Sequence, residues 1–267
     1  MSVSVAFDKA RAEGRAALIG YLPAGFPTVA GGIAAATALA EGGVDLVEIG
    51  YPYSDPVMDG PVIQRASEIA LAHGVRAADV LRTVEAVAAT GVPAVVMTYW
   101  NLVEHYRGGG VGGFARDLAA AGGSGLITPD LIPEEADEWL AASDEHGLDR
   151  VFLVAPSSTD ARIASTVAAC RGFVYATSVM GVTGARSVTS SAAPALVARV
   201  RAVSGPLPVG VGLGVRDGDQ AAEVGAFADG VIVGSALVST LLDASGPDRG
   251  LRALRALTAE LAAGVRR

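Results

Sequence analysis

The chain has 267 residues, of which 51% are hydrophobic, and a formal net charge of -8 at pH 7. This acidic balance argues against nucleic acid or an anionic membrane surface as the main partner. No apolar run approaches the roughly 20 residues of a membrane-spanning helix, and the charged N-terminal segment does not resemble a signal peptide. Cys170 is the only cysteine. These features predict a cytoplasmic globular protein without an internal disulfide.

Along the chain, continuous apolar runs alternate with segments of helical periodicity. The first segment, 3–14, is predicted to be a short amphipathic helix. Apolar runs of this kind are typical of strands buried on both faces. The predicted strands are 17–22, 45–49, 93–98, 125–128, 150–154, 173–176, 208–211 and 230–233. The predicted helices that follow them are 28–42, 62–73, 77–90, 114–121, 134–146, 160–170, 193–203, 217–225, 235–242 and 247–265. The glycine-rich stretch 107–113 is predicted to be a flexible connection.

Eight strand–helix units in a chain of this length are typical of an α/β protein with a (β/α)8 TIM barrel. We therefore predict a single barrel domain over residues 1–267, with an extra N-terminal helix and a short phosphate-binding helix after the eighth strand. An open doubly wound sheet is the alternative, and it should carry a glycine-rich fingerprint after its first strand. The segment 22–25 does not provide one.

Two carboxylates lie on the connection that follows the second predicted strand. Glu48 interrupts an apolar strand, where an acid is costly unless it is paired or does chemistry. Asp59 lies further along the loop, immediately before a helix. Taken alone, Glu48 could be a buried structural acid. Asp59 taken alone could be an ordinary turn residue at the start of a helix. Together on one strand-to-helix connection, they predict a pair for acid–base catalysis.

The remaining titratable residues narrow the chemistry. Lys9 is the only lysine and lies in the N-terminal segment, which argues against a Schiff-base mechanism. His73, His105 and His146 are far apart in the sequence and lack the spacing of metal ligands, so no metal is expected.

Glycine-rich loops follow the sixth, seventh and eighth predicted strands. They are 181–184, 212–214 and 234–235. A glycine pair alone is usually a tight turn. Three such loops at neighbouring strand ends of a barrel instead predict a phosphate site, because backbone N–H groups and a helix N-terminus supply the positive potential.

Large side chains near other strand ends could form the wall of an apolar pocket. These are Tyr21, Tyr99, Leu126, Leu153 and Tyr175. Packing in the barrel core explains them equally well. Tyr175 is the one that we predict to contact a ligand, because a phenol there can reach a carboxylate as well as an aromatic ring.

The segment 47–64 carries a family resemblance. Its parts Glu48-Ile49-Gly50, 52–56 and 59–64 resemble the tryptophan synthase alpha subunits. The resemblance covers essentially the whole chain, and further motifs recur in family order at 99–101, 129–131, 155–159, 181–184, 212–214 and 234–235. The chain departs from the family pattern in the glycine-rich stretch 107–113, at Gly123-Ser124 and at Thr128.

The resemblance implies a lyase that cleaves indole-3-glycerol phosphate to indole and glyceraldehyde 3-phosphate. Glu48 would shuttle a proton, and Asp59, predicted to be more exposed and ionised, would support positive charge on the indole ring. Thr183 and its loop would close over the substrate and orient Asp59. The implied substrate-binding residues are Tyr175, Thr183, Gly184, Leu213, Gly214, Gly234 and Ser235.

The resemblance also implies a partner, a tryptophan synthase beta subunit in an alpha2-beta2 heterotetramer. Ser54, Asp55 and Pro56 are the predicted contact loop. No cofactor is expected in this chain, and pyridoxal phosphate is expected only in the beta subunit.

Three alternatives remain at this stage. One is another phosphate-binding barrel, either a sugar-phosphate isomerase or an indole-glycerol-phosphate synthase, although the synthase relies on lysines that this chain lacks. The second is a catalytically weak subunit that only activates a partner, against which the presence of both Glu48 and Asp59 argues. The third is a lyase that works alone and releases indole.

Overall fold

The computed structural model describes residues 2–177, 192–212 and 214–267, and within them nine parallel strands form one sheet. The strands are β1 Ala17–Pro23, β2 Leu46–Gly50, β3 Ala94–Met97, β4 Gly125–Ile127, β5 Asp149–Val151, β6 Leu153–Val154, β7 Val174–Thr177, β8 Val209–Gly212 and β9 Gly230–Val233. Their order in the sheet is β5-β4-β3-β2-β1-β9-β8-β7-β6.

The two edge strands, β5 and β6, are neighbours in the chain and only Phe152 separates them. β5 pairs with β4, while β6 pairs with β7, so the sheet curves round until its two edges meet. The backbone carbonyl of Phe152 accepts from Tyr175 N at 3.1 Å and so continues the pairing with β7. The single fifth strand predicted at 150–154 is therefore two short strands that change pairing partner at Phe152.

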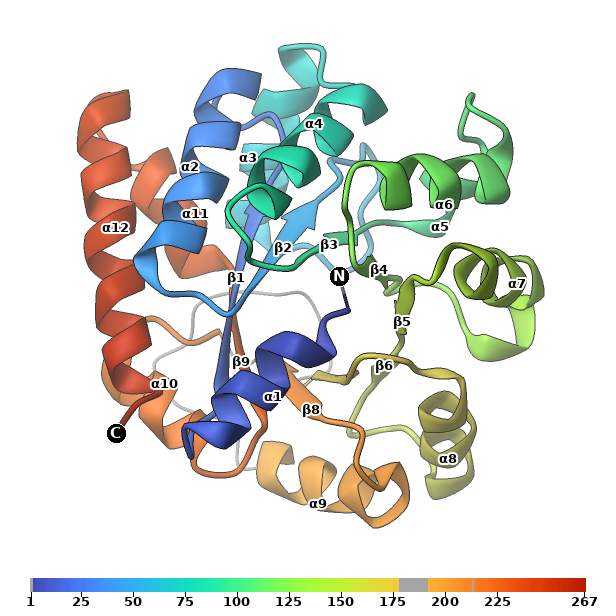
Figure 1. Cartoon of the computed structure of the whole chain (residues 1–267). Coiled ribbons are helices and arrows are strands. Elements are labelled where there is room, and N and C mark those ends of the chain that lie inside the picture. Colours follow the sequence, from blue (N-terminus) through green and yellow to red (C-terminus); the bar gives the residue numbers. More distant parts are fainter. Residues whose placement is uncertain (1, 178–191, 213) are drawn as a thin grey trace.

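Helices surround the strands on all sides (Figure 1). They are α1 Ser4–Ala12, α2 Val29–Gly42, α3 Pro61–Ala72, α4 Ala77–Ala88, α5 Trp100–Glu104, α6 Gly110–Ala120, the 3-10 helix η1 Pro133–Glu135, α7 Asp137–His146, α8 Asp160–Ala169, α9 Ala192–Ser204, α10 Gly218–Gly225, α11 Ser235–Leu242 and α12 Pro247–Gly264. This ring of helices around parallel strands confirms the predicted (β/α)8 TIM barrel, with α1 as the extra N-terminal helix. The described helices include none with the length and apolar character needed to cross a membrane.

Two helical segments differ from the sequence prediction. α5 begins at Trp100, directly after the third strand, where the sequence indicated only a strand end. α6 begins at Gly110, inside the stretch predicted to be a flexible connection. Glycine lowers helix propensity, but Val111 and Phe114 of this segment are buried in the core, and packing overrides the local preference.

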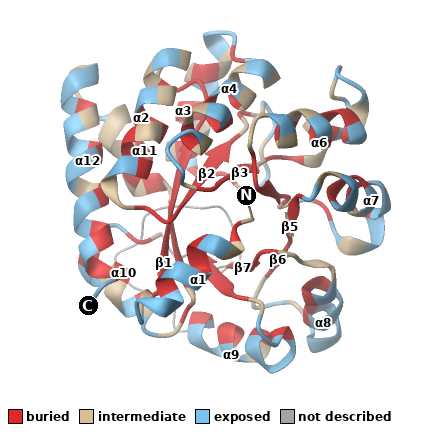
Figure 2. Ribbon diagram, in the orientation of Figure 1, coloured by how far each residue is buried: buried red, intermediate tan, exposed pale blue. Residues whose placement is uncertain are grey.

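The interior of the barrel is closed at one end by α1. Val3, just before this helix, and Ala6, Phe7 and Ala10 within it pack in one cluster with the inward-facing side chains of the strands. The ring centroids of Phe7 and Phe173 are 5.2 Å apart. The buried surface of α1 faces the strands in Figure 2. The N-terminal end of the barrel is thus filled by side chains, which leaves the carboxyl ends of the strands as the place for chemistry.

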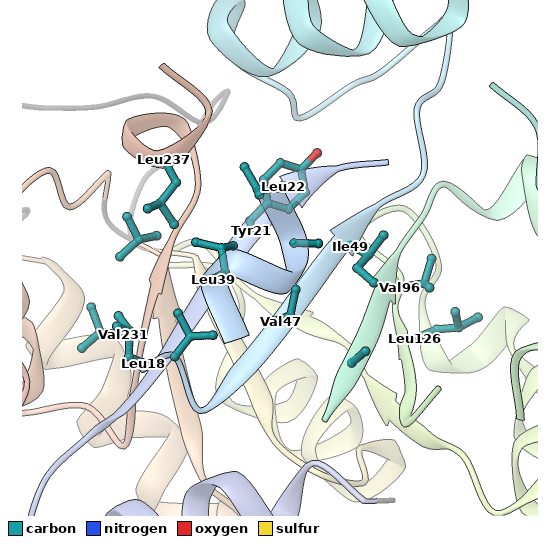
Figure 3. Packing of buried hydrophobic residues seen from close by; sticks show 14 of the residues in the cluster. Leu18, Tyr21, Leu22, Leu39, Val47, Ile49, Val96, Leu126, Val231 and Leu237 are labelled. Atoms are coloured by element: carbon teal, nitrogen blue, oxygen red, sulfur yellow. The ribbon is translucent and has the colours of Figure 1, made fainter. Parts of the chain in front are cut away.

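A second core lies between the strands and the outer helices. Figure 3 shows Val47 and Ile49 of β2 beside Val96 of β3 and Leu126 of β4 in this layer. Because side chains alternate along a strand, residues 46, 48 and 50 face the barrel interior when residues 47 and 49 face the helices. This alternation places Glu48 inside the barrel, near the carboxyl end of β2.

Candidate active site

Glu48 is held inside the barrel on β2, where it pairs in register with Tyr21 of β1 and Val95 of β3. The residue is 3% exposed, and no described residue forms a hydrogen bond with its Oε2 atom. Burial, and then the negative charge of Asp59, raises the pKa of Glu48 to about 8. A carboxyl group with such a pKa can hold or release a proton near neutral pH, as a general acid and base must.

Asp59 lies at the far end of the β2–α3 connection, just before the Gly60-Pro61 start of α3. The sequence predicts a more exposed Asp59, but the structure leaves only 5% of it exposed, so it is almost as buried as Glu48. The Tyr99 hydroxyl lies against it and donates to Asp59 Oδ1 at 2.8 Å. Burial raises the pKa of Asp59, and the hydrogen bond from Tyr99 opposes this rise because it favours the ionised form.

Tyr99 is a functional candidate whose role the sequence analysis missed. Its hydroxyl also accepts from Met58 N at 3.1 Å, so the residue fixes both the backbone beside Asp59 and the carboxylate itself. Tyr99 follows β3, which pairs with β2 in the sheet. That adjacency was the available signal, because side chains at the ends of neighbouring parallel strands meet at one edge. The sequence predicted only a wall residue or core packing at this position.

Two further tyrosines occupy the barrel mouth above glycines. A Cβ atom at Gly50 would collide with the Tyr21 hydroxyl, and one at Gly212 would lie 2.5 Å from the Tyr175 hydroxyl. The pKa of Tyr175 is raised by burial and then by the charge of Glu48, which places this phenol near the acid. The two glycines provide the space that the rings of Tyr175 and Tyr21 need, and a ligand contact at Tyr175 stays a prediction.

The predicted phosphate loops end β8 and β9, which are neighbours in the sheet. Gly214 has φ +68°, a left-handed conformation that favours glycine. Gly234 caps the N-terminus of α11, and Ser235 is its first, buried residue. The structure thus brings Gly214, Gly234 and Ser235 to one side of the mouth. The other predicted residues, Thr183, Gly184 and Leu213, lie outside the described residues.

The predicted partner loop lies between β2 and Asp59. Ser54 and Asp55 are exposed, and the Ser54 hydroxyl donates to Asp55 Oδ2 at 2.6 Å. Pro56 is partly exposed, while Val57 is 67% exposed. At the base of the loop, the ring centroid of Tyr53 lies 5.3 Å from that of Tyr99. The loop is therefore in contact with the tyrosine that holds Asp59.

A metal centre is not evident in the part of the chain that the structure describes, where no group of three His, Cys, Asp or Glu side chains could hold an ion. The described site offers two carboxyl groups, phenols and backbone N–H groups. A (β/α)8 barrel that gathers these groups at the carboxyl ends of its strands has the arrangement of a barrel enzyme, with groups suited to proton transfer on a small substrate.

Comparison with known proteins gives the family. The model of the family "Tryptophan synthase alpha chain" matches residues 7–266. A tryptophan synthase alpha chain of Salinispora arenicola is 72% identical over 264 residues, which are 99% of this chain and 97% of that protein. One of Mycobacterium marinum is 68% identical over 260 residues, or 97% of this chain and 93% of that protein. The chain belongs to the tryptophan synthase alpha chain family.

Solved structures agree with this assignment. A structure of Mycobacterium tuberculosis tryptophan synthase matches with a TM-score of 0.92 at 63% identity, over 99% of this chain and 98% of that one. A structure from Aquifex aeolicus matches with a TM-score of 0.89 at 36% identity, over the full length of both chains. The reaction of the family, and of this chain, is the lyase cleavage of indole-3-glycerol phosphate to indole and glyceraldehyde 3-phosphate in tryptophan biosynthesis.

Proposed function

We propose that Glu48 and Asp59 carry the proton and charge chemistry of this cleavage. The observation that supports the proposal is the burial of both acids on one β2–α3 connection, with the pKa of Glu48 raised to about 8. An acid in that range suits a group that must give up a proton and take one back within a single turnover.

The reaction requires a proton at indole C3, because protonation makes the ring a leaving group. Protonated Glu48 donates to C3, and the positive charge that develops at the ring nitrogen is stabilised by the ionised Asp59 carboxylate. Glu48, now ionised, takes the proton from the substrate hydroxyl on the carbon next to the ring. As that O–H bond breaks, a C=O bond forms and the carbon–carbon bond to C3 is cleaved. Indole and the aldehyde are released, and Glu48 is protonated again.

Substrate orientation is proposed to come from the opposite side of the mouth. The backbone N–H groups of Gly214, Gly234 and Ser235, with the N-terminus of α11, are suited to hold the phosphate group. We include Gly184 and Leu213 in this set, and Thr183 as the residue that orients Asp59, from their sequence motifs. Tyr175 would contact the indole end, near Glu48. No step of this scheme uses a cofactor in the chain.

Asp59→Asn is expected to lower the rate of indole release by about 10²–10³-fold, equivalent to about 3–4 kcal/mol, because the amide cannot stabilise the positive ring nitrogen. The asparagine side-chain oxygen can still accept from Tyr99, so the fold should be retained. Steady-state indole release measured beside a thermal unfolding curve checks this. A correctly folded variant with near-normal turnover would remove Asp59 from the mechanism.

We also propose that a tryptophan synthase beta subunit binds the loop of Ser54, Asp55 and Pro56, in an alpha2-beta2 heterotetramer that carries pyridoxal phosphate only in the beta subunit. The support for this proposal comes from the exposure and the contacts of the loop itself. The loop exposes Asp55 and the apolar side chain of Val57, and its Tyr53 ring packs on Tyr99, which holds Asp59. A partner that moves this loop would therefore act on the position of a catalytic acid. The alternative is a lyase that works alone, and a substitution at Asp55 distinguishes the two.

Asp55→Ala is expected to lower indole release in the complex with the beta subunit by about tenfold, while the isolated chain changes by less than about twofold. The carboxylate is exposed and its only hydrogen bond among the described residues comes from the adjacent Ser54, so its removal should leave the barrel intact. Indole release is measured with and without added beta subunit, and Ser54→Ala, a second change in the same loop, separates loss of that hydrogen bond from loss of the Asp55 charge. Equal losses in both settings would show that the loop carries no signal from a partner.

A further inference from the structure

Tyr21 lies between the two halves of the site but has no role in the scheme above. On β1 it pairs in register with Glu48 of β2. Its hydroxyl lies where a Cβ of Gly50 would be, and its ring lies 3.3 Å from the place of a Cβ on Gly234. Figure 3 shows the Tyr21 ring at the end of β1. The side chain therefore reaches from the phosphate side of the mouth to the end of β2, next to the acids.

The charges that face the Tyr21 hydroxyl are the two acids. Burial raises the pKa of Tyr21, and the charges of Asp59 and then Glu48 raise it further, with smaller effects from Tyr99 and Tyr175. Both effects favour the protonated phenol, which can donate a hydrogen bond.

Glu48 needs such a donor at one stage of the reaction. Its Oε2 has no hydrogen-bond partner among the described residues, which a protonated acid tolerates more easily than an ionised one. Between giving up one proton and taking another, Glu48 is ionised while it is still buried. The groups that face Glu48 are Asp59 from the β2–α3 connection, which repels the anion, the phenols of Tyr21 on β1 and Tyr175 on β7, and the apolar Val95 on β3.

We propose that Tyr21 is a positioning residue of the acid pair, whose hydroxyl donates to Glu48 when Glu48 is ionised. The inference rests on the proposed role of Glu48 and adds the group that makes its ionised state accessible. Tyr175 also faces Glu48, but besides burial only the charge of Glu48 raises its pKa, and not that of Asp59. We assign Tyr175 to contact with the substrate.

Tyr21→Phe tests this, since phenylalanine keeps the ring over Gly50 and beside Gly234 and removes only the hydroxyl. Loss of a donor to the ionised form should raise the titration midpoint of Glu48 by about one pH unit. The limb of the pH–rate profile that reports the ionisation of Glu48 should move to higher pH by the same amount. This holds whether activity requires the protonated or the ionised form of Glu48. Indole release near neutral pH falls by about tenfold. Tyr106→Phe is the matched control, because it removes a phenol that donates to Asp117 on α6 instead.

The measurement is a carbon-13 NMR titration of the Glu48 carboxyl in the full chain, with Glu48→Gln used to assign the resonance. An upward shift in Tyr21→Phe and none in Tyr106→Phe supports the proposal. An unchanged midpoint overturns it, even if the rate falls, because the hydroxyl would then serve the substrate. A shift found only in Tyr175→Phe overturns it too. The titration does not depend on turnover, so the result stands apart from any failure of the proposed catalytic roles. Fluorotyrosine at position 21, a stronger donor, should lower the midpoint and provides a test without deletion.

Discussion

Glu48→Gln is expected to abolish nearly all indole release, by about 10³-fold or more, while substrate binding changes little. Glutamine has the size of glutamate but can neither deliver a proton to C3 nor take one from the substrate hydroxyl. Because Glu48 lies inside the barrel among residues of β1, β2 and β3, the neutral amide should be accommodated without loss of the fold. Steady-state kinetics should therefore show a fall in kcat with a KM close to that of the wild type.

The same variant has a signature in stability that is independent of turnover. The pKa of Glu48 is about 8 in the folded chain, against an ordinary value of 4.5 for a glutamate in an unfolded chain. Between these values folded Glu48 is protonated and unfolded Glu48 is ionised, so the unfolded state binds fewer protons and stability falls as pH rises. The slope is about 1.4 kcal/mol per pH unit for this one group. Glu48→Gln lacks this contribution, so its unfolding free energy should rise relative to the wild type from about pH 5 to pH 8 and the difference should level off above that.

Gly234→Asp is expected to weaken phosphorylated ligands by about a hundredfold, or about 2.7 kcal/mol, and bare indole by less than about threefold. The new carboxylate would stand at the N-terminus of α11, where it takes the place of the phosphate and repels it. Aspartate is a favourable N-cap residue, so the helix itself should not be lost. Calorimetry with glyceraldehyde 3-phosphate and with indole separates the two effects.

Gly234→Ala is the matched control for this substitution. It adds the same Cβ, 3.3 Å from Tyr21 Cδ1, without adding charge. The alanine variant should retain most of the affinity for the phosphorylated ligand. Equal losses of affinity for both ligands in Gly234→Asp would instead move the phosphate to another part of the mouth.

The fold was accessible from sequence because its elements carry strong local patterns. Strands such as 230–233 and helices such as 235–242 were predicted with the bounds that the structure shows. The change of pairing partner at Phe152 was not predictable, because it depends on where β4 and β7 end around the barrel. The start of α6 at Gly110 was also missed, since the packing of Val111 and Phe114 outweighs the low helix propensity of the neighbouring glycines.

The part of the site that lies on a single segment of the chain was predictable from the sequence. Glu48 in an apolar strand and Asp59 before a helix are visible in the sequence as a pair. The hydrogen bond that Asp59 accepts from Tyr99 was not, because Tyr99 is 40 residues away and meets Asp59 only when β2 and β3 pair. The same holds for Tyr21, whose position over Gly50 follows from strand register rather than from any motif. Contacts across the sheet are the part of the site that a single sequence does not display.

The central claim, that Glu48 moves the protons of the cleavage, is tested most directly by a single turnover. Wild type and Glu48→Gln are mixed in excess over indole-3-glycerol phosphate, and indole formation is followed in time at several enzyme concentrations. The dependence of the rate on enzyme concentration separates substrate binding from the chemical step. The account predicts that the two proteins saturate at similar enzyme concentrations, while the chemical step in Glu48→Gln is slower by about 10³-fold or more. A chemical step within about tenfold of the wild-type value would contradict it.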